Sequence, residues 1–309
     1  MYLLLSLLLT FAMAKVYAVQ TKNSNSVQSF FTNQTDVRPQ IYRIESRAFS
    51  QNDATNKLNV LKKHGFDWNE MINLNGVVVY KNDSKEQWLM YETNQSRYRY
   101  NNNQIDGFTA VDTADIPSLK KTSDLYLSNL LGTDAQKFVY VNSEYEYQTL
   151  REQPQHLYSI TFRYVRVTDG RQILGITNHA RITLGMNKMI KAFDFTNPLL
   201  IKEREINVKI KSSAMQKYLN KCIQNPKFTQ GDDGSLLPIA DVDIKEANNS
   251  YFEVITSNQR MLYPHISFYT HSNMTDGRIL KRELHFIEDA ESVENASQDD
   301  IINYLSPKK

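Results

Sequence analysis

Cysteine is nearly absent from this sequence of 309 residues, since Cys222 is the single example. No intrachain disulfide can form, so the fold must be held by its core alone. Glycine occurs only ten times, and no long Pro/Ser-rich tract is present, which argues against large disordered linkers. Cys222 falls on the apolar stripe of a predicted helix, where a buried core residue is a better interpretation than a nucleophile.

An excess of charge of one sign is also lacking. The 36 Lys and Arg residues against 34 Asp and Glu residues leave a formal net charge of +2. The basic residues are scattered, without the stripe that binding to phosphate backbones requires, so we expect no nucleic acid partner. No His-Glu-x-x-His, G-x-S-x-G, Walker or G-x-G-x-x-G motif is present. We therefore expect no catalytic residue, no metal and no cofactor.

Histidines and acids could supply metal ligands or general acids, and their spacing argues against both roles. His265 and His271 share a face of a predicted strand but lie about 20 Å apart along it, too far for one metal ion. Two pairs of acids alternate on predicted strands, where solvated faces explain them better than acid–base chemistry. These pairs are Glu144 with Glu146 and Asp241 with Asp243. Residues 231–234, Gly-Asp-Asp-Gly, lack the ligand spacing of an EF-hand loop and predict a surface turn.

Long apolar runs are rare, and one opens the chain. Residues 2–14 are predominantly apolar and are followed by small-residue patterns that end at Ala14 and Ala18. The run is too short for a helix to cross a bilayer core of about 30 Å, but it suits a signal peptide. An uncleaved anchor and a buried helix are the alternatives. We predict a signal peptide at 1–18, no transmembrane span in the mature chain, and a secreted, periplasmic or cell-envelope location.

What the sequence has in abundance is aromatic residues, with 18 tyrosines and 14 phenylalanines, which favour β structure. Three stretches show the same order, a helix signal followed by alternating strands. The helices are predicted at 52–65, 117–132 and 212–226, and a short closing helix at 297–307. Asn52 or Asp53 is the expected N-cap of the first helix, and Gly65 its stop.

The tetrapeptide Thr-Asp-Gly-Arg occurs twice, each time between alternating runs. Glycine adopts the positive φ of a tight hairpin turn at little cost, so both copies predict hairpin turns. The turn residues are Asp169 with Gly170, and Asp276 with Gly277. The shared setting indicates two similarly built units, with coincidence as the alternative, because Asp-Gly turns are common.

Two aromatic stretches, Ser-Glu-Tyr-Glu-Tyr-Gln and Ser-Arg-Tyr-Arg-Tyr, are candidate interaction surfaces. Their tyrosines could present an exposed face or an edge to a partner strand. Packing in the core and between strands is the alternative. The candidate residues are Tyr145, Tyr147, Tyr98 and Tyr100.

Residues 117–195 resemble the propeptide modules of thermolysin-like and fungalysin-like metallopeptidases, through a helix, a strand and the hairpin "FRYVRVTDGRQILG". Residues 205–290 resemble the PepSY module, through "INVKIKSSAMQKYL", "LYPHISFYTH" and "HFIEDAESVEN". Residues 38–105 resemble a smaller strand-plus-helix unit often found ahead of these modules in secreted bacterial proteins. The resemblance implies an α+β fold of tandem cystatin-like units, each a curved antiparallel sheet packed on one helix.

The domain organisation that follows has five parts: a signal peptide (1–18), a flexible lead (19–37), a small strand-helix-strand unit (38–112), a propeptide-like unit (113–200), and a PepSY-like unit with a C-terminal helix (201–309). The resemblance supplies no catalytic residue. It implies an exported, non-enzymatic module that binds or inhibits another extracytoplasmic protein, a peptidase or a sensor. Two alternatives stay open: a cell-envelope carrier of a lipid or peptide in the concave sheet, and a hydrolase that uses an acid such as Glu146 or Asp243.

Overall fold

The computed structural model describes residues 20–22, 39–103, 116–148, 156–175, 178–185, 188–205, 228–230, 236–255, 259–274, 277 and 279–287. The chain divides into two compact units. Unit 1 comprises residues 1–39, 205–250 and 264–309, and unit 2 comprises residues 40–204 and 251–263. Within the described part of the chain, no helix is both long enough and apolar enough to cross a membrane.

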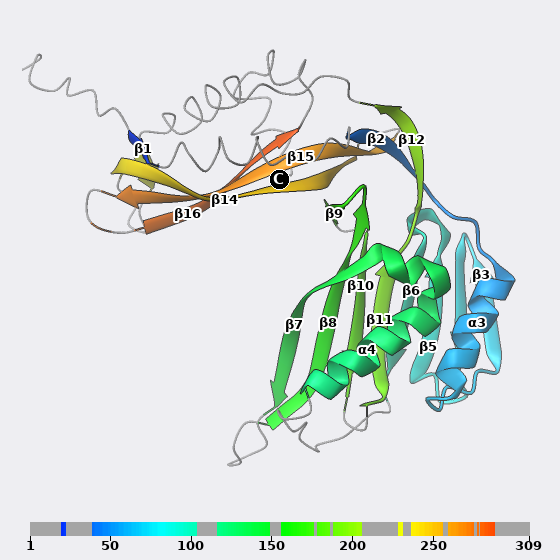
Figure 1. The fold of residues 1–309 in the computed structure, drawn as a ribbon. Helices are drawn as coiled ribbons and strands as arrows, with labels where there is room; N and C mark the ends of the chain where they lie inside the picture. Colours follow the sequence, from blue (N-terminus) through cyan, green and yellow to red (C-terminus); the bar gives the residue numbers. More distant parts are fainter. Residues whose placement is uncertain are drawn as a thin grey trace, which may run out of the picture. The chain divides into compact units, whose positions relative to one another are not determined.

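Unit 2 is built on a large antiparallel sheet, which Figure 1 shows with two helices lying on one of its faces. Each strand pairs with its neighbour in antiparallel register. In spatial order the strands are β3 (Glu70–Leu74), β4 (Val77–Lys81), β5 (Gln87–Glu92), β6 (Arg97–Asn102), β11 (Ile190–Thr196), β10 (His179–Leu184), β8 (His156–Thr168) and β7 (Phe138–Gln148). We call this set the large sheet, and the face away from the helices its open face.

The two helices are α3 (Gln51–Lys62) and α4 (Ile116–Leu131), close to the predicted ranges. Ser50 is the N-cap of α3, because its hydroxyl accepts from the backbone N–H of Asp53 at 3.3 Å. The predicted caps, Asn52 and Asp53, therefore lie within the first turn of the helix. The left-handed stop is at Gly65, with φ +84°.

The predicted fold class is wrong: the structure is sheet-dominated and does not consist of tandem cystatin-like units. Residues 38–112 and 113–200 were expected to form separate sheets, but β6 and β11 pair directly, from Ala192 opposite Asn101 to Thr196 opposite Arg97. Pairing removes two strand edges that separate units would leave exposed. Sequence periodicity gives each strand's faces but not which strands meet at an edge.

A single hydrophobic core continues across the junction of β6 and β11. The ring of Tyr98 lies 5.3 Å from that of Phe195, and Tyr100 stacks on Phe193 at 5.6 Å. Both helices contribute to the same core. Its buried helical residues are Ala54, Leu58, Leu61, Leu119, Leu127 and Leu130. The spacing of apolar residues three and four positions apart thus predicted α3 and α4 correctly. The two helices pack on one shared sheet, however, and not on two separate ones.

The rest of unit 2 is a second group of strands, which continues from β8 through β9 (Arg171–Leu174). It contains residues 251–255 of β14, residues 260–263 of β15, β2 (Gln40–Glu45), and β12 (Leu199–Glu205) up to residue 204. Asp169 and Gly170 form the two-residue turn between β8 and β9, with φ values of 49° and 72°, and Thr168 pairs with Arg171. Positive φ at both positions is the type I′ geometry favoured by hairpins.

The described strands of unit 1 are β1 (Gln20–Lys22), β13 (Phe228–Gln230), β14 (Leu236–Ile255) up to residue 250, β15 (Arg260–Met274) from residue 264, and β16 (Ile279–Ile287). β1 pairs parallel with β14, so residues 20–22 of the expected flexible lead form a strand. β15 and β16 form a hairpin, and Gly277 in its connection has φ +87°. The predicted signal peptide, both later helices, Cys222 and Asp276 lie outside the described residues.

Candidate functional site

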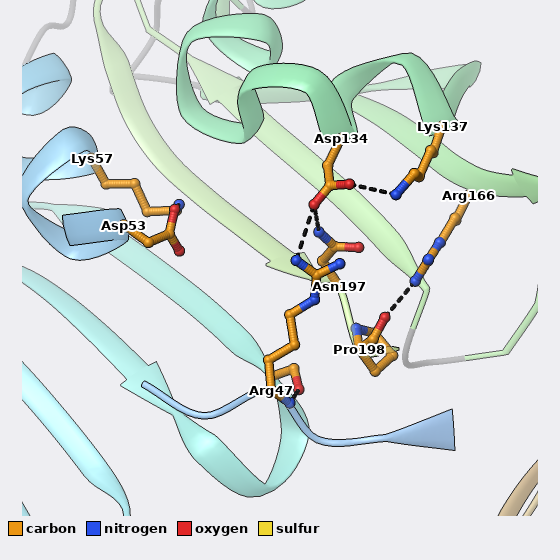
Figure 2. A network of polar contacts seen from close by, with 9 residues as sticks. Arg47, Asp53, Lys57, Asp134, Lys137, Arg166, Asn197 and Pro198 are labelled. Atoms are coloured by element: carbon orange, nitrogen blue, oxygen red, sulfur yellow. Dashed lines mark hydrogen bonds and ion pairs between the residues drawn. The ribbon is translucent and has the colours of Figure 1, made fainter. Parts of the chain in front are cut away.

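A network of charged side chains ties three connecting segments of unit 2 together, as Figure 2 shows. At its centre is Asp134 in the 3-10 helix η3 (Gly132–Lys137). Its carboxylate accepts hydrogen bonds from Lys137 at 2.5 Å, Asn197 at 2.7 Å and Arg47 at 3.1 Å. Burial alone would raise the pKa of Asp134, but these partners lower it. The segments before α3, after α4 and after β11 are thereby joined.

Lys57 lies beside this network with its side chain only 2% exposed. The ammonium contacts the carboxylate of Asp53 one turn earlier on α3, and it lies 4.4 Å from the centre of the Tyr98 ring. Desolvation lowers the pKa of Lys57, while Asp53 opposes that shift. A hollow of about 320 Å³ adjoins these groups and also reaches Arg47 and Asp134.

The charges around this hollow are matched within the protein. Lys57 pairs with Asp53, and Arg47 pairs with Asp134, so each cation of the lining has its own carboxylate. Such pairing leaves no surplus charge to attract an ion. We interpret the network around Asp134 as structural, because it connects three segments of unit 2. Among the described residues, no group of His, Cys, Asp or Glu side chains could hold a metal ion.

A second hollow, of about 440 Å³, lies on the open face of the large sheet, and we call it the open-face hollow. Strand register places Arg99 on β6 opposite Asp194 on β11, and Asp194 opposite Arg181 on β10. The three side chains therefore form a row across adjacent strands. The hollow is lined by Trp88, Arg99, Tyr100, Asn101, Glu144, Thr161, Arg181, Thr183, Ala192, Phe193 and Asp194.

Asp194 in this row is already engaged by another residue. Arg97 donates to both carboxylate oxygens, at 2.8 and 2.5 Å, and His179 lies 3.7 Å away. Burial would raise the pKa of Asp194, but the hydrogen bonds from Arg97 and the nearby imidazole of His179 hold it well below its usual range. Asp194 is therefore an ionised carboxylate, and both of its oxygens already accept hydrogen bonds from the Arg97 guanidinium.

Arg99 and Arg181 are left without a carboxylate partner among the described residues. The guanidinium of Arg99 lies 5.8 Å from the centre of the Trp88 ring, a cation–π contact that leaves its N–H groups free for an acceptor. Arg163 differs, because it pairs with Glu144 at 2.6 Å at the margin of the hollow. The open-face hollow therefore carries two unmatched cations.

The third feature is the edge strand β7, which pairs with β8 and, within the described part of the chain, with no other strand. Its apolar side chains are unusually exposed: Tyr145 is 45% and Tyr147 is 49% exposed. Val139, Tyr140 and Val141 are exposed as well. The sequence predicted alternation of core and solvent along this strand, whereas all but one of the side chains from 139 to 147 are exposed.

The structure separates the four candidate tyrosines. Tyr98 is 4% and Tyr100 is 1% exposed, so both belong to the core and their assignment to an interaction surface is wrong. The physical reason is that the helices cover the tyrosine face of β6, and the arginines alternate onto the open face. Tyr145 and Tyr147 stay exposed because β7 lies at the edge of the sheet.

Of the two predicted pairs of acids, Glu144 and Glu146 each have a separate set of partners. Glu144 pairs with Arg163, and Glu146 accepts from Ser159 at 2.5 Å and from Lys191 at 3.3 Å. The hydrogen bond from Ser159 contributes most to lowering the pKa of Glu146, which therefore stays ionised near neutral pH. Asp241 and Asp243 lie on β14, with side chains outside the described set.

His265 and His271, the two histidines predicted to share a strand face, both lie on β15. His265 is 1% exposed in β15, and its Nδ1 lies 2.8 Å from the hydroxyl of Ser250. His271 lies further along the same strand. We interpret both residues as structural histidines of the strand.

Sequence reasoning missed Arg99, Arg181 and the Arg97–Asp194 pair. A signal was available, because Arg97, Arg99 and Asp194 each alternate with aromatic residues in their strands. Successive side chains of a strand point to opposite faces of the sheet, so charged residues that alternate with buried aromatic residues all lie on the face opposite the core. Which strands carry neighbouring charges depends on the β6–β11 pairing, and that pairing was not predicted.

Among solved structures, the chain is similar to an uncharacterized protein from Eubacterium rectale ATCC 33656, with a TM-score of 0.50 and 12% sequence identity. The similarity covers 82% of this chain and 84% of that chain. At such low identity it shows the fold alone. No protein-family model matches the chain, and no curated protein matches it. The resemblance to propeptide and PepSY modules therefore stays a prediction.

Proposed function

We propose that the chain is a non-enzymatic binding module for another extracytoplasmic protein, and that β7 accepts an extended strand of that partner. The observation that carries the proposal is the exposed apolar edge of β7, where Tyr145 and Tyr147 are about half exposed beside buried neighbours on β8. An unpaired strand edge offers backbone donors and acceptors to an incoming strand.

The regular part of this edge is short and well defined. Register shifts occur between Tyr140 and Asn142 and between Glu146 and Tyr147, so the ladder is regular from Asn142 to Glu146. We place the docking strand against these residues. At the other edge of the large sheet, β3 has five residues in all, whereas β7 extends over eleven and offers a longer edge for pairing.

Register with β8 fixes the chemistry of the two sides of the docking strand. Tyr145 lies opposite the buried Ile160, so one side of the partner should carry aliphatic or aromatic residues that pack on Tyr145 and Tyr147. Glu144 and Glu146 point to the open face and are 52% and 53% exposed. The other side of the partner should carry Lys or Arg, because these half-exposed carboxylates can each take a second basic neighbour beside Arg163 and Lys191.

A display library of short extended peptides tests this proposal. Selection on the folded protein should enrich sequences that alternate apolar and basic residues. Tyr145→Lys should weaken the selected peptides by about tenfold or more, since it removes a central apolar anchor. Leu74→Lys on β3 is the matched control, because Leu74 is 65% exposed at the opposite edge. Binders without alternation, or equal losses in both variants, would contradict the proposal.

The alternative of a lipid carrier receives little support from the open-face hollow. Its lining contains Arg99 and Arg181, which pair with no described carboxylate, and an alkyl chain would bury these charges without compensation. A hydrolase based on Glu146 is also less well supported, because Ser159 and then Lys191 stabilise its ionised form at a half-exposed surface position. Protein binding is the function that the exposed edge supports best.

A further inference from the structure

We infer that the open-face hollow binds a small organic anion, carrying carboxylate or phosphate groups, between Arg99 and Arg181. This inference is independent of the docking strand on β7, because Arg99 and Arg181 lie on interior strands of the sheet. It assigns a ligand chemistry to the face that the helices leave uncovered.

The balance of charge carries the inference. The Arg97 guanidinium donates hydrogen bonds to both oxygens of Asp194, and Arg163 forms an ion pair with Glu144. Each acid of the lining therefore already has a partner. Arg99 and Arg181 flank Asp194 in the register and pair with no described carboxylate. The acid between them, Asp194, is already bound by Arg97, so the two guanidinium groups have no carboxylate of their own among the described residues and can lower their repulsion by binding an anion.

This contrasts with the hollow beside the polar network around Asp134. There, Lys57 and Arg47 each have a carboxylate at contact distance, so the same fold contains a matched and an unmatched pair of cations. The two hollows have comparable volumes, about 320 and 440 Å³. They differ in whether the cations that line them have carboxylate partners.

The geometry limits the ligand to a compact, polar molecule. β11 separates β6 from β10, so the backbones that carry Arg99 and Arg181 are about 10 Å apart. Two arginine side chains can converge on one ligand across that span, and each guanidinium matches a carboxylate or a phosphate with two parallel hydrogen bonds.

The remaining lining fits oxygen-rich ligands. Thr161 and Thr183 present hydroxyls that lie 2.8 Å from each other, and each can still make a further hydrogen bond. Trp88 forms an aromatic border next to Arg99. A volume of about 440 Å³ accommodates a small multiply charged acid or a sugar phosphate.

Fluorescence titration of the full chain tests the inference, because Trp88 borders the hollow. The only other tryptophan, Trp68, is replaced in a Trp68→Phe background so that the signal reports on Trp88 alone. Citrate, glucose 6-phosphate and glucose are titrated at low salt. We expect saturable changes with the two anions and none with glucose. The tighter of the two anions then identifies carboxylate or phosphate as the preferred head group, and either result supports the site.

Substitutions assign the binding to the hollow. Arg99→Gln and Arg181→Gln should each weaken citrate or glucose 6-phosphate binding by about tenfold, the loss expected for a charged hydrogen-bonding partner. Arg181→Lys should bind with intermediate affinity, because lysine keeps the positive charge but cannot donate the two parallel hydrogen bonds of a guanidinium group. Lys62→Gln removes one positive charge from an exposed position on α3 and should leave binding unchanged.

Three outcomes would overturn the inference. The first is the absence of saturable binding of either anion at low salt. The second is equal affinity for glucose and the anions, which would show that charge is not recognised. The third is an equal loss in Lys62→Gln and the two arginine variants, which would indicate a general effect of net charge. Thermal unfolding of each variant confirms that the folded state is being compared.

Discussion

Tyr42 on β2 donates its hydroxyl hydrogen to the carboxylate of Asp169, in the turn between β8 and β9, with 2.6 Å between the oxygens. Tyr251 donates to the same carboxylate oxygen at 2.9 Å. One turn residue thus anchors two strands that are remote in sequence. Asp169 therefore has a second role beyond the left-handed conformation that its turn requires.

Replacement of Asp169 separates these two roles. Asp169→Asn tolerates the left-handed turn but loses the charged acceptor, and we expect a loss of about 1–2 kcal/mol in the free energy of unfolding. Gly170→Ala keeps both phenol contacts and should cost about 1 kcal/mol through strain at φ +72°. Urea unfolding measures both. In a double-mutant cycle with Tyr42→Phe, additive effects would show that Asp169 and Tyr42 do not interact energetically.

The same contact predicts how stability depends on alkaline pH. Burial and the hydrogen bond to Asp169 raise the pKa of Tyr42 to about 12, above the value near 10 of an unfolded tyrosine. The neutral phenol is favoured by folding, so its contribution is complete below pH 10 and is lost as the pH rises through 12. Unfolding free energies between pH 9 and about 12 should fall less steeply in Tyr42→Phe than in the unmodified chain. Parallel curves would contradict the assignment.

The Arg97–Asp194 pair predicts the acid side of the stability profile. The pKa of Asp194 is depressed in the folded state, so the pair contributes stability above the unfolded value of about 4 and loses it as the pH falls further. Asp194→Asn and Arg97→Gln should both be less stable at neutral pH and should lose less stability on acidification. If either variant shows the full acid dependence of the unmodified chain, other carboxylates are responsible.

Lys57 and Asp53 should respond unequally to substitution. Asp53→Asn leaves a buried ammonium without its carboxylate, at an expected cost of about 2 kcal/mol, discounted because Asp53 is 48% exposed. Lys57→Met keeps the apolar stem against Tyr98 and leaves Asp53 to water, so it should cost less. Thermal or urea unfolding decides, and a larger loss in Lys57→Met would reverse this interpretation.

Local features of the fold were predictable from the sequence. The apolar positions and the glycine stop placed α3 within a few residues, and the Asp-Gly dipeptide located the turn at residues 169–170. These features depend on the conformations of single residues and on short-range spacing. The N-cap is Ser50 and not Asn52 or Asp53, because all three are residue types that can cap a helix.

Features that depend on which edges meet were not predictable. Alternation showed that Tyr98 and Tyr100 share a face, but not that α3 and α4 cover it. The row of Arg99, Asp194 and Arg181 exists only because β6 pairs with β11. Sequence periodicity reports side-chain faces, while strand order is decided by long-range packing. The candidate sites on the open face therefore required the structure.

Hydrogen exchange on β7 tests the central proposal most directly. With a display-selected peptide bound, we predict slowed exchange at backbone amides between Asn142 and Glu146, and unchanged exchange on β3 at the opposite edge. Tyr145→Lys should abolish that protection at the same peptide concentration. Protection that appears on β3 or across the open face, with β7 exchanging as in the free protein, would contradict strand addition at this edge.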